Sequence, residues 1–221
     1  MASSIAPLLG LAMTQPDAAK LKLLCLHGYS QNAAVLRDRS GGFRKAFKKS
    51  RFDLHFVDGP FACGDSVEDA EQKRLAWWSG DSIQTAYVGW KEAHAALAAV
   101  WTDGQFDGIF GFSQGAAAAA MLCADLKPRP LFGVFVSGFV PRDQDAARRL
   151  LEGVGDVPTL HVFGEQDQLV TPDRSQALTE LFADATIVTH PGGHTIPSSA
   201  AVRAQVTEFV ENKVPPSRGT Q

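Results

Sequence analysis

Residues 111–115, Gly-Phe-Ser-Gln-Gly, place one serine between two glycines, each two positions away from it. A run that favours a strand, residues 106–112, precedes the serine, and an alanine-rich run that favours a helix follows it. A tight strand-to-helix turn leaves no room for side chains at the two glycine positions. The pattern therefore predicts that Ser113 is a nucleophile at a helix N-terminus, where free N–H groups favour negative charge. A glycine-rich turn with a bystander serine is the alternative.

A serine nucleophile needs a base to accept its proton and a carboxylate to orient that base. In α/β-hydrolases these groups follow along the chain in the order serine, acid, histidine. Asp167 follows a predicted strand on a glycine-containing loop, and we expect it to be the acid. Glu165 is its close competitor, and Asp143 and Asp145 beyond the preceding strand are weaker ones.

Two histidines follow the predicted acid, and we expect His194 to be the base. It comes after a Pro-Gly-Gly turn, which can carry an imidazole over the sheet edge toward Ser113. His190 falls where the last predicted strand ends, so a structural role is expected for it.

An oxyanion hole requires two N–H donors beside the nucleophile. One donor is expected to be the N–H of Gln114, directly after the serine. The other is expected to be the N–H of Tyr29, because Gly28 lets the backbone of that early loop approach a substrate. His27 is expected to brace the loop.

Residues 58–84 interrupt the alternation of strands and helices and contain two adjacent tryptophans, Trp77 and Trp78. Loops of this length are often functional. We expect the tryptophans to line an apolar substrate pocket with Phe61, Tyr87 and Phe139. A local core beneath the loop is the alternative for the two tryptophans.

The elements that must position these residues alternate along the chain. Strands are predicted at residues 21–27, 51–57, 106–112, 131–137, 158–163 and 185–190, and helices at 40–49, 85–101, 114–126, 142–153, 172–183 and 198–213. Most strands are continuous apolar runs, as in parallel sheets covered on both faces. The fold class is therefore α/β: a three-layer, doubly wound, mainly parallel sheet of about six strands. Its first and third strands should flank the point where strand order reverses.

The composition is that of an ordinary globular protein, with 221 residues, 45% hydrophobic residues and a net charge of −3. We expect one domain over residues 21–213, with a disordered tail at 1–20 and a frayed one at 214–221; an unusual targeting peptide is the alternative for the first tail. The charge and the lack of a basic stripe argue against nucleic acid, and no stretch is apolar enough to span a membrane. The three cysteines lack metal-like spacing, which indicates reduced thiols.

The chain resembles the FSH-type family of serine hydrolases. Five blocks occur in order: Leu-Cys-Leu-His-Gly-Tyr (24–29), Phe-Asp-Gly-Ile-Phe-Gly-Phe-Ser-Gln-Gly (106–115), Val-Ser-Gly-Phe (136–139), His-Val-Phe-Gly-Glu-Gln-Asp (161–167) and Gly-Gly-His (192–194). The similarity covers about residues 21–209 and looks closest to the ovarian tumour suppressor candidate esterase branch. By motif match, Ser113, Asp167 and His194 take the family's triad positions, and the adjacent tryptophans match its Trp-Trp pair.

This resemblance implies an α/β-hydrolase fold, a cytoplasmic location, and no cofactor or metal. It also implies hydrolysis of carboxylic esters with medium- to long-chain alkyl groups. The expected partner is a small acyl ester or thioester, and the sequence leaves the oligomeric state open. Two rival functions remain: an acyl-thioesterase using the same triad, and a catalytically silent binding protein on the same fold.

Overall fold

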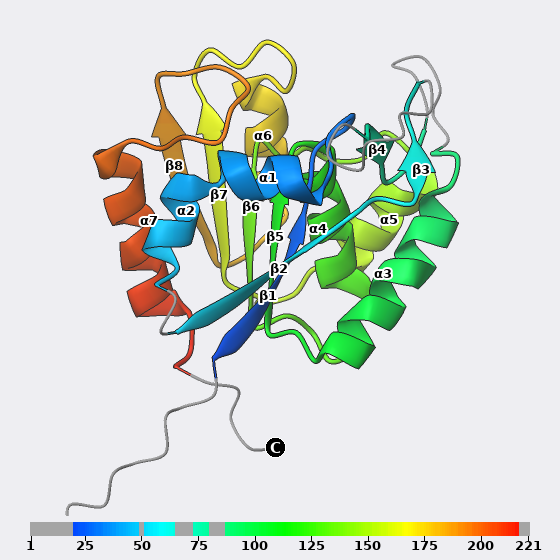
Figure 1. Cartoon of the computed structure of the whole chain (residues 1–221), viewed down its shortest axis with the longest axis horizontal. Coiled ribbons are helices and arrows are strands. Elements are labelled where there is room, and N and C mark those ends of the chain that lie inside the picture. Colours follow the sequence, from blue (N-terminus) through cyan, green and yellow to red (C-terminus); the bar gives the residue numbers. More distant parts are fainter. Residues whose placement is uncertain (1–19, 49–50, 65–72, 80–86, 217–221) are drawn as a thin grey trace, which may run out of the picture.

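The computed structural model describes residues 20–48, 51–64, 73–79 and 87–216, and a six-stranded sheet forms its centre (Figure 1). The strands lie in the order β2-β1-β5-β6-β7-β8, and every neighbouring pair is parallel. Their bounds are β1 (Leu21–Leu26), β2 (Phe52–Val57), β5 (Gly108–Phe112), β6 (Phe132–Val136), β7 (Thr159–Gly164) and β8 (Ala185–His190). The predicted fold class is confirmed, and all six strands lie within two residues of their predicted bounds.

Helices cover both faces of the sheet, each over its own apolar core (Figure 1). One face carries α1 (Ala33–Arg39), α2 (Gly41–Ala46) and α7 (Ala200–Lys213). The other carries α3 (Trp90–Gly104), α4 (Gln114–Asp125), α5 (Gln144–Gly153) and α6 (Pro172–Thr179). Among the described residues, none of these helices has the length and apolar character needed to cross a bilayer.

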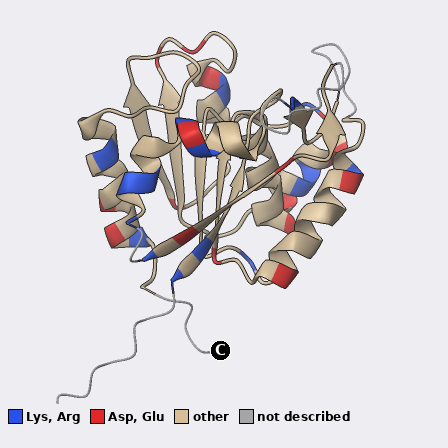
Figure 2. Cartoon of the chain, in the orientation of Figure 1, with Lys and Arg blue, Asp and Glu red and all other residues tan. Residues whose placement is uncertain are grey.

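Charged residues lie mainly on the helices and loops, as Figure 2 shows. Acidic and basic residues both occur on the outer helices, while β5, β6 and β7 contain none. These three strands are buried along their whole length, as a parallel strand covered on both faces should be.

The first helical region differs from the prediction. A single helix at residues 40–49 was expected, but the chain forms α1 from Ala33 and then α2, with Ser40 between them. The Asn32 side chain starts α1 by accepting a hydrogen bond from the Val35 N–H at 2.9 Å. Only Leu36 of α1 is fully buried, so the sequence offered no repeating apolar face to reveal this short helix.

The loop region after β2 also holds structure that the sequence did not reveal. Two short strands, β3 (Phe61–Ala62) and β4 (Leu75–Ala76), pair antiparallel within the excursion. Strands of two residues are too short to show periodicity. The helix expected from residue 85 begins only at Trp90, after Gly89 at φ 88°; residues 80–86 lie outside the described part of the chain.

The strand order reverses between β1 and β5, as predicted. β1 pairs with β2 on one side and with β5 on the other, and Leu26 lies opposite Gly111. The loops that follow these two strands therefore emerge side by side at the carboxyl edge of the sheet, where open α/β sheets bind ligands.

Candidate active site

Ser113 occupies the turn between β5 and α4. Its backbone angles, φ 54° and ψ −116°, are costly for a residue with a side chain, so surrounding contacts must hold them. The Ser113 N–H donates to the Val136 carbonyl at 2.9 Å. The Ser113 carbonyl in turn accepts from the N–H groups of Ala116 and Ala117 in the first turn of the helix. The serine is thus fixed between strand and helix.

The two glycines of the motif are required by close packing. A Cβ atom on Gly111 would overlap the carbonyl group of Gly115. One on Gly115 would overlap the carbonyl oxygens of Leu26 and His27, at the end of β1. The start of α4 therefore lies directly against the loop that follows β1, a contact that any larger residue would prevent.

Ser113, His194 and Asp167 form one continuous hydrogen-bonded chain. His194 Nε2 lies 2.9 Å from the Ser113 Oγ, and His194 Nδ1 lies 2.7 Å from the Asp167 Oδ2. The other carboxylate oxygen, Oδ1, accepts from the N–H groups of Leu169 and Val170, each at 2.9 Å. The carboxylate therefore has a fixed orientation, with one oxygen held by the backbone and one facing the imidazole.

The Asp167 side chain is fully buried, yet its surroundings favour the ionised form. Burial alone would raise the pKa of this carboxyl, but the hydrogen bonds from His194, Val170 and Leu169 and the charge of His194 lower the pKa below its ordinary value. An ionised carboxylate accepts the Nδ1–H of the imidazole, which leaves Nε2 free to accept the serine proton.

The competing acids occupy other positions. Glu165 is exposed, and its carboxylate accepts from the Thr189 hydroxyl at 3.1 Å. Asp143 caps α5 by accepting from the Ala146 N–H, and Asp145 is exposed on the same helix. Among the described residues, none of these three acids has a hydrogen bond or ion pair with an imidazole.

His190 stabilises the turn that leads to His194. Its Nδ1 accepts from the Gly192 N–H at 3.2 Å, and burial lowers its pKa below the ordinary value, although the charges of Asp167 and Glu165 oppose this. The neutral ring at the end of β8 thus has the structural contacts that the sequence suggested for it.

His27 joins the loop after β1 to the loop after β2. Its Nδ1–H donates to the Gly28 carbonyl and its Nε2 accepts from the Gly59 N–H, both at 2.8 Å. Burial lowers the pKa of this histidine, against the raising effects of its bond to Gly28 and the charge of Asp58. A neutral ring is required here, because protonation would remove the acceptor that Gly59 uses.

The expected oxyanion donors lie at adjacent places, Tyr29 on the loop after β1 and Gln114 at the first residue of α4. The N–H groups of both residues have no hydrogen-bond acceptor among the described residues. A Cβ on Gly28 would lie 3.0 Å from the Phe112 ring, so the loop packs tightly beside β5. The Tyr29 side chain is exposed, whereas that of Gln114 is buried.

The five aromatic residues expected around a pocket differ in exposure. Trp77 and Trp78 are only 1% and 4% exposed, so the local core that the sequence allowed as an alternative describes their surroundings. Trp78 stacks on Tyr87, with ring centroids 4.5 Å apart. Phe61, Tyr87 and Phe139 are partly buried and pack against the same core.

The buried side chain of Gln114 is a feature that sequence reasoning missed. It forms hydrogen bonds with the backbone of Trp77 and Trp78. The available signal was a polar side chain beside a run of small apolar residues, because a buried amide requires partners. No local pattern indicated which residues those partners would be.

Metal ligands do not cluster in the described part of the chain: no group of three or more His, Cys, Asp or Glu side chains there could hold an ion. The chemistry that the described side chains support is nucleophilic attack by an oxygen with a histidine base.

Comparison with known proteins places this chain in a family. The model of the serine hydrolase family FSH1 matches residues 13–206. Esterase OVCA2 of Danio rerio is 33% identical over 88% of this chain and 98% of its own length. Esterase OVCA2 of Bos taurus is 34% identical over 86% of this chain and 96% of its own.

Solved structures share the fold. Esterase PE8 superposes with a TM-score of 0.68 at 24% identity, covering 89% of this chain and 94% of that one. Zea mays acyl-protein thioesterase 2 superposes with a TM-score of 0.66 at 15% identity, covering 90% and 95%. The chain thus belongs to the FSH1 serine hydrolase family, and it is a carboxylic ester hydrolase with the α/β-hydrolase fold.

Proposed function

We propose that this protein is a serine esterase that cleaves acyl esters with an apolar chain, using Ser113, His194 and Asp167 as its triad. The observation that carries the proposal is the unbroken chain of contacts at 2.9 Å and 2.7 Å among these side chains. The ionised state favoured for Asp167 supports the imidazole tautomer that such a triad needs.

In the first half of the reaction, the Ser113 Oγ attacks the ester carbonyl carbon while its proton moves to His194 Nε2. The N–H groups of Tyr29 and Gln114 donate to the oxygen that becomes negative. The N-terminus of α4 adds positive potential at the same place. Collapse of this intermediate expels the alcohol, which takes its proton from His194 and leaves an acyl group on Ser113.

In the second half, water attacks the acyl carbonyl and gives its proton to His194. The oxyanion re-forms in the same place, and its collapse returns the proton to Ser113 and releases the carboxylic acid. Asp167 keeps the Nδ1–H of His194 directed toward itself throughout and stabilises the positive charge on the ring.

The apolar part of the substrate is proposed to contact Phe61, Tyr87 and Phe139. Phe139 lies three residues beyond β6, whose last residue, Val136, accepts the N–H of Ser113. The guanidinium of Arg174 lies 4.8 Å from the Phe139 ring centroid and covers one side of it. A medium to long acyl chain would bury surface on these rings, at about 0.8 kcal/mol for each methylene.

Labelling with a fluorophosphonate probe tests the nucleophile. Ser113→Ala should lose both the label and the hydrolysis of p-nitrophenyl butyrate while retaining its fold. Ser137→Ala is the matched control, because Ser137 also has a positive φ at a strand end and its buried hydroxyl has no partner among the described residues. Label that persists on Ser113→Ala would refute the assignment, and an unlabelled wild-type protein would favour a silent binding protein.

An acyl-thioesterase is the second candidate, because the same residues would cleave a thioester and a thioesterase shares the fold. Matched p-nitrophenyl esters and acyl thioesters of the same chain length separate the two. We expect the higher kcat/KM on the oxygen esters; a consistent preference for thioesters at every chain length would overturn the ester assignment and leave the triad in place.

A further inference from the structure

Residues 73–79, here called the tryptophan segment, bind the loop that follows β1. The Leu75 N–H donates to the Gln31 carbonyl at 2.8 Å, and the Asn32 side chain donates to the Lys73 carbonyl at 2.9 Å. The indole N–H of Trp77 donates to the His27 carbonyl at 2.8 Å. Three hydrogen bonds therefore hold residues 27–32, which include the proposed donor Tyr29, against this segment.

The same segment holds the residue after the nucleophile. The Trp77 N–H donates to the Gln114 Oε1 at 3.0 Å, and the Gln114 Nε2 donates to the Trp78 carbonyl at 2.9 Å. Both ends of the Gln114 amide are thus bound by adjacent peptide groups. Trp77 contacts both places, because its backbone N–H binds the Gln114 side chain and its indole binds the His27 carbonyl.

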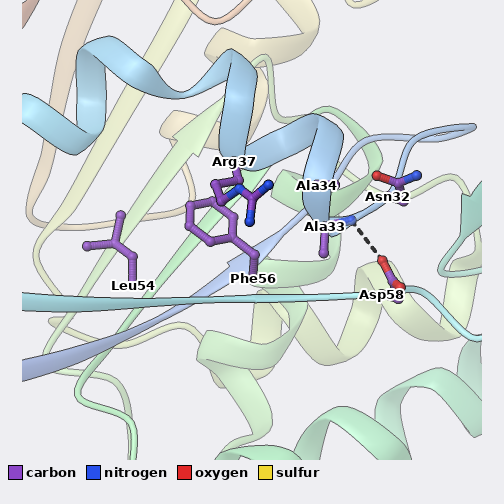
Figure 3. A pocket seen from close by; sticks show the side chains of 7 residues that line it. All are labelled: Asn32, Ala33, Ala34, Arg37, Leu54, Phe56 and Asp58. Carbon is purple, nitrogen blue, oxygen red and sulfur yellow. Dashed lines mark hydrogen bonds between the residues drawn. The ribbon is translucent and has the colours of Figure 1, made fainter. Parts of the chain in front are cut away.

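The loop after β2 supports this arrangement from the other side. The Gly59 N–H donates to His27 Nε2, and a Cβ on Gly59 would lie 2.6 Å from the Ala76 carbonyl oxygen. Asp58 accepts from the Ala33 N–H at 2.7 Å, beside a cavity of about 470 Å³ at the sheet edge (Figure 3). The loop that carries Tyr29 is therefore bound by the tryptophan segment on one side and by the loop after β2 on the other.

We propose that Trp77 is a positioning residue that sets the spacing between the two oxyanion donors, Tyr29 N–H and Gln114 N–H. This inference rests on the proposed function and adds a positioning role for a residue that is almost fully buried. Oxyanion donors must lie within about 3 Å of the developing charge, and their value depends on being fixed in advance. Trp77 connects the loop that carries Tyr29 with the start of α4, although these two segments are far apart in the sequence.

The main test compares Trp77→Phe with Trp101→Phe. Trp101 is a matched control, because it is also 1% exposed and its indole N–H donates to a backbone carbonyl, that of Pro128, at 3.0 Å. Both changes remove one buried indole hydrogen bond. Only Trp77→Phe loosens the donor loop, so only it should lower kcat, by about tenfold and with little change in KM; removing a donor outright costs about 100-fold or more.

The affinity of an acyl trifluoromethyl ketone gives a second readout. This inhibitor forms a tetrahedral adduct whose oxygen occupies the oxyanion hole, so its binding should weaken by about the same factor as kcat. A competitive inhibitor that lacks the ketone should bind Trp77→Phe and the wild type equally. Equal kcat and equal ketone affinity in Trp77→Phe and Trp101→Phe would overturn the inference.

Gln114→Met provides a second test of the same role if Trp77→Phe folds poorly. It removes both bonds of the Gln114 side chain but keeps the backbone N–H and a similar volume. It should also lower kcat and ketone affinity together, and an unchanged kcat would refute the positioning role. Fluorophosphonate labelling of Ser113 is measured alongside. A label on another serine would overturn the proposed function as well. If Ser113 is labelled normally and kcat is unchanged, only the positioning role of Trp77 is refuted.

Discussion

Replacement of Asp167 by asparagine tests the orientation of the proposed triad, because the backbone dictates how the new amide must lie. In the wild type, Oδ1 accepts two N–H groups, from Leu169 and Val170. Only the amide oxygen of an asparagine can take that place. The amide NH₂ must then face His194 Nδ1 at the position of the present 2.7 Å contact.

An NH₂ group facing Nδ1 stabilises the wrong tautomer of His194. Nδ1 becomes the acceptor, the proton moves to Nε2, and the imidazole can no longer accept the proton of Ser113. The same exchange in a serine protease triad lowers kcat by about 10⁴-fold. Because two backbone donors fix the amide here, we expect kcat to fall by nearly that factor, and by at least about 100-fold.

The assay is kcat/KM for p-nitrophenyl butyrate at neutral pH, with circular dichroism to verify folding. Glu165→Gln is the matched control, since Glu165 is an exposed acid two residues away that contacts Thr189 instead of the imidazole. It should retain full activity. An Asp167→Asn variant that keeps more than about 1% of wild-type activity, or a Glu165→Gln variant that loses activity to a similar extent, would refute this reasoning.

Three further predictions follow from burial and packing. Burial lowers the pKa of His161 to about 3, so the unfolded chain takes up this proton first, and stability should fall as pH drops below about 6.5. Between pH 7 and pH 5, the free energy of unfolding from urea titrations should therefore fall by about 2 kcal/mol less in His161→Gln than in the wild type. An equal fall in both proteins would contradict this. Gly115→Ala, whose Cβ would overlap backbone, should lower the free energy of unfolding by about 3 kcal/mol in the same titrations, whereas Gly41→Ala, whose Cβ would meet open space, should change it very little. With p-nitrophenyl esters of increasing length, kcat/KM should rise about two- to fourfold per carbon, and Phe139→Ala should flatten this rise more than it lowers acetate hydrolysis; an unchanged slope would remove Phe139 from the pocket.

The sheet and the proposed triad could be predicted because their signals are local. β5 is a five-residue apolar run that ends at a glycine-flanked serine, and residues 164 and 192–193 supply the glycines of the loops that carry Asp167 and His194. Such runs and turns are readable without knowing what packs against them.

The parts that could not be predicted depend on distant contacts. β4 exists because Leu75 pairs with Ala62 and with Gln31, and neither partner is visible in a two-residue strand. The adjacent tryptophans were compatible with a pocket wall or a local core. Their burial, together with the bonds of Trp77 to His27 and Gln114, favours the local core, and both features depend on distant contacts.

β8 is one of the two edge strands of the sheet, and within the described part of the chain it pairs with β7 alone, yet the loop that follows it carries His194. Edge strands open at a lower free energy than central ones, so a partial opening of β8 would withdraw the imidazole while the central strands stay paired. Thermal inactivation should then precede the loss of secondary structure. The half-life of activity at high temperature would then depend on the local opening of β8 and not on the melting temperature of the whole domain.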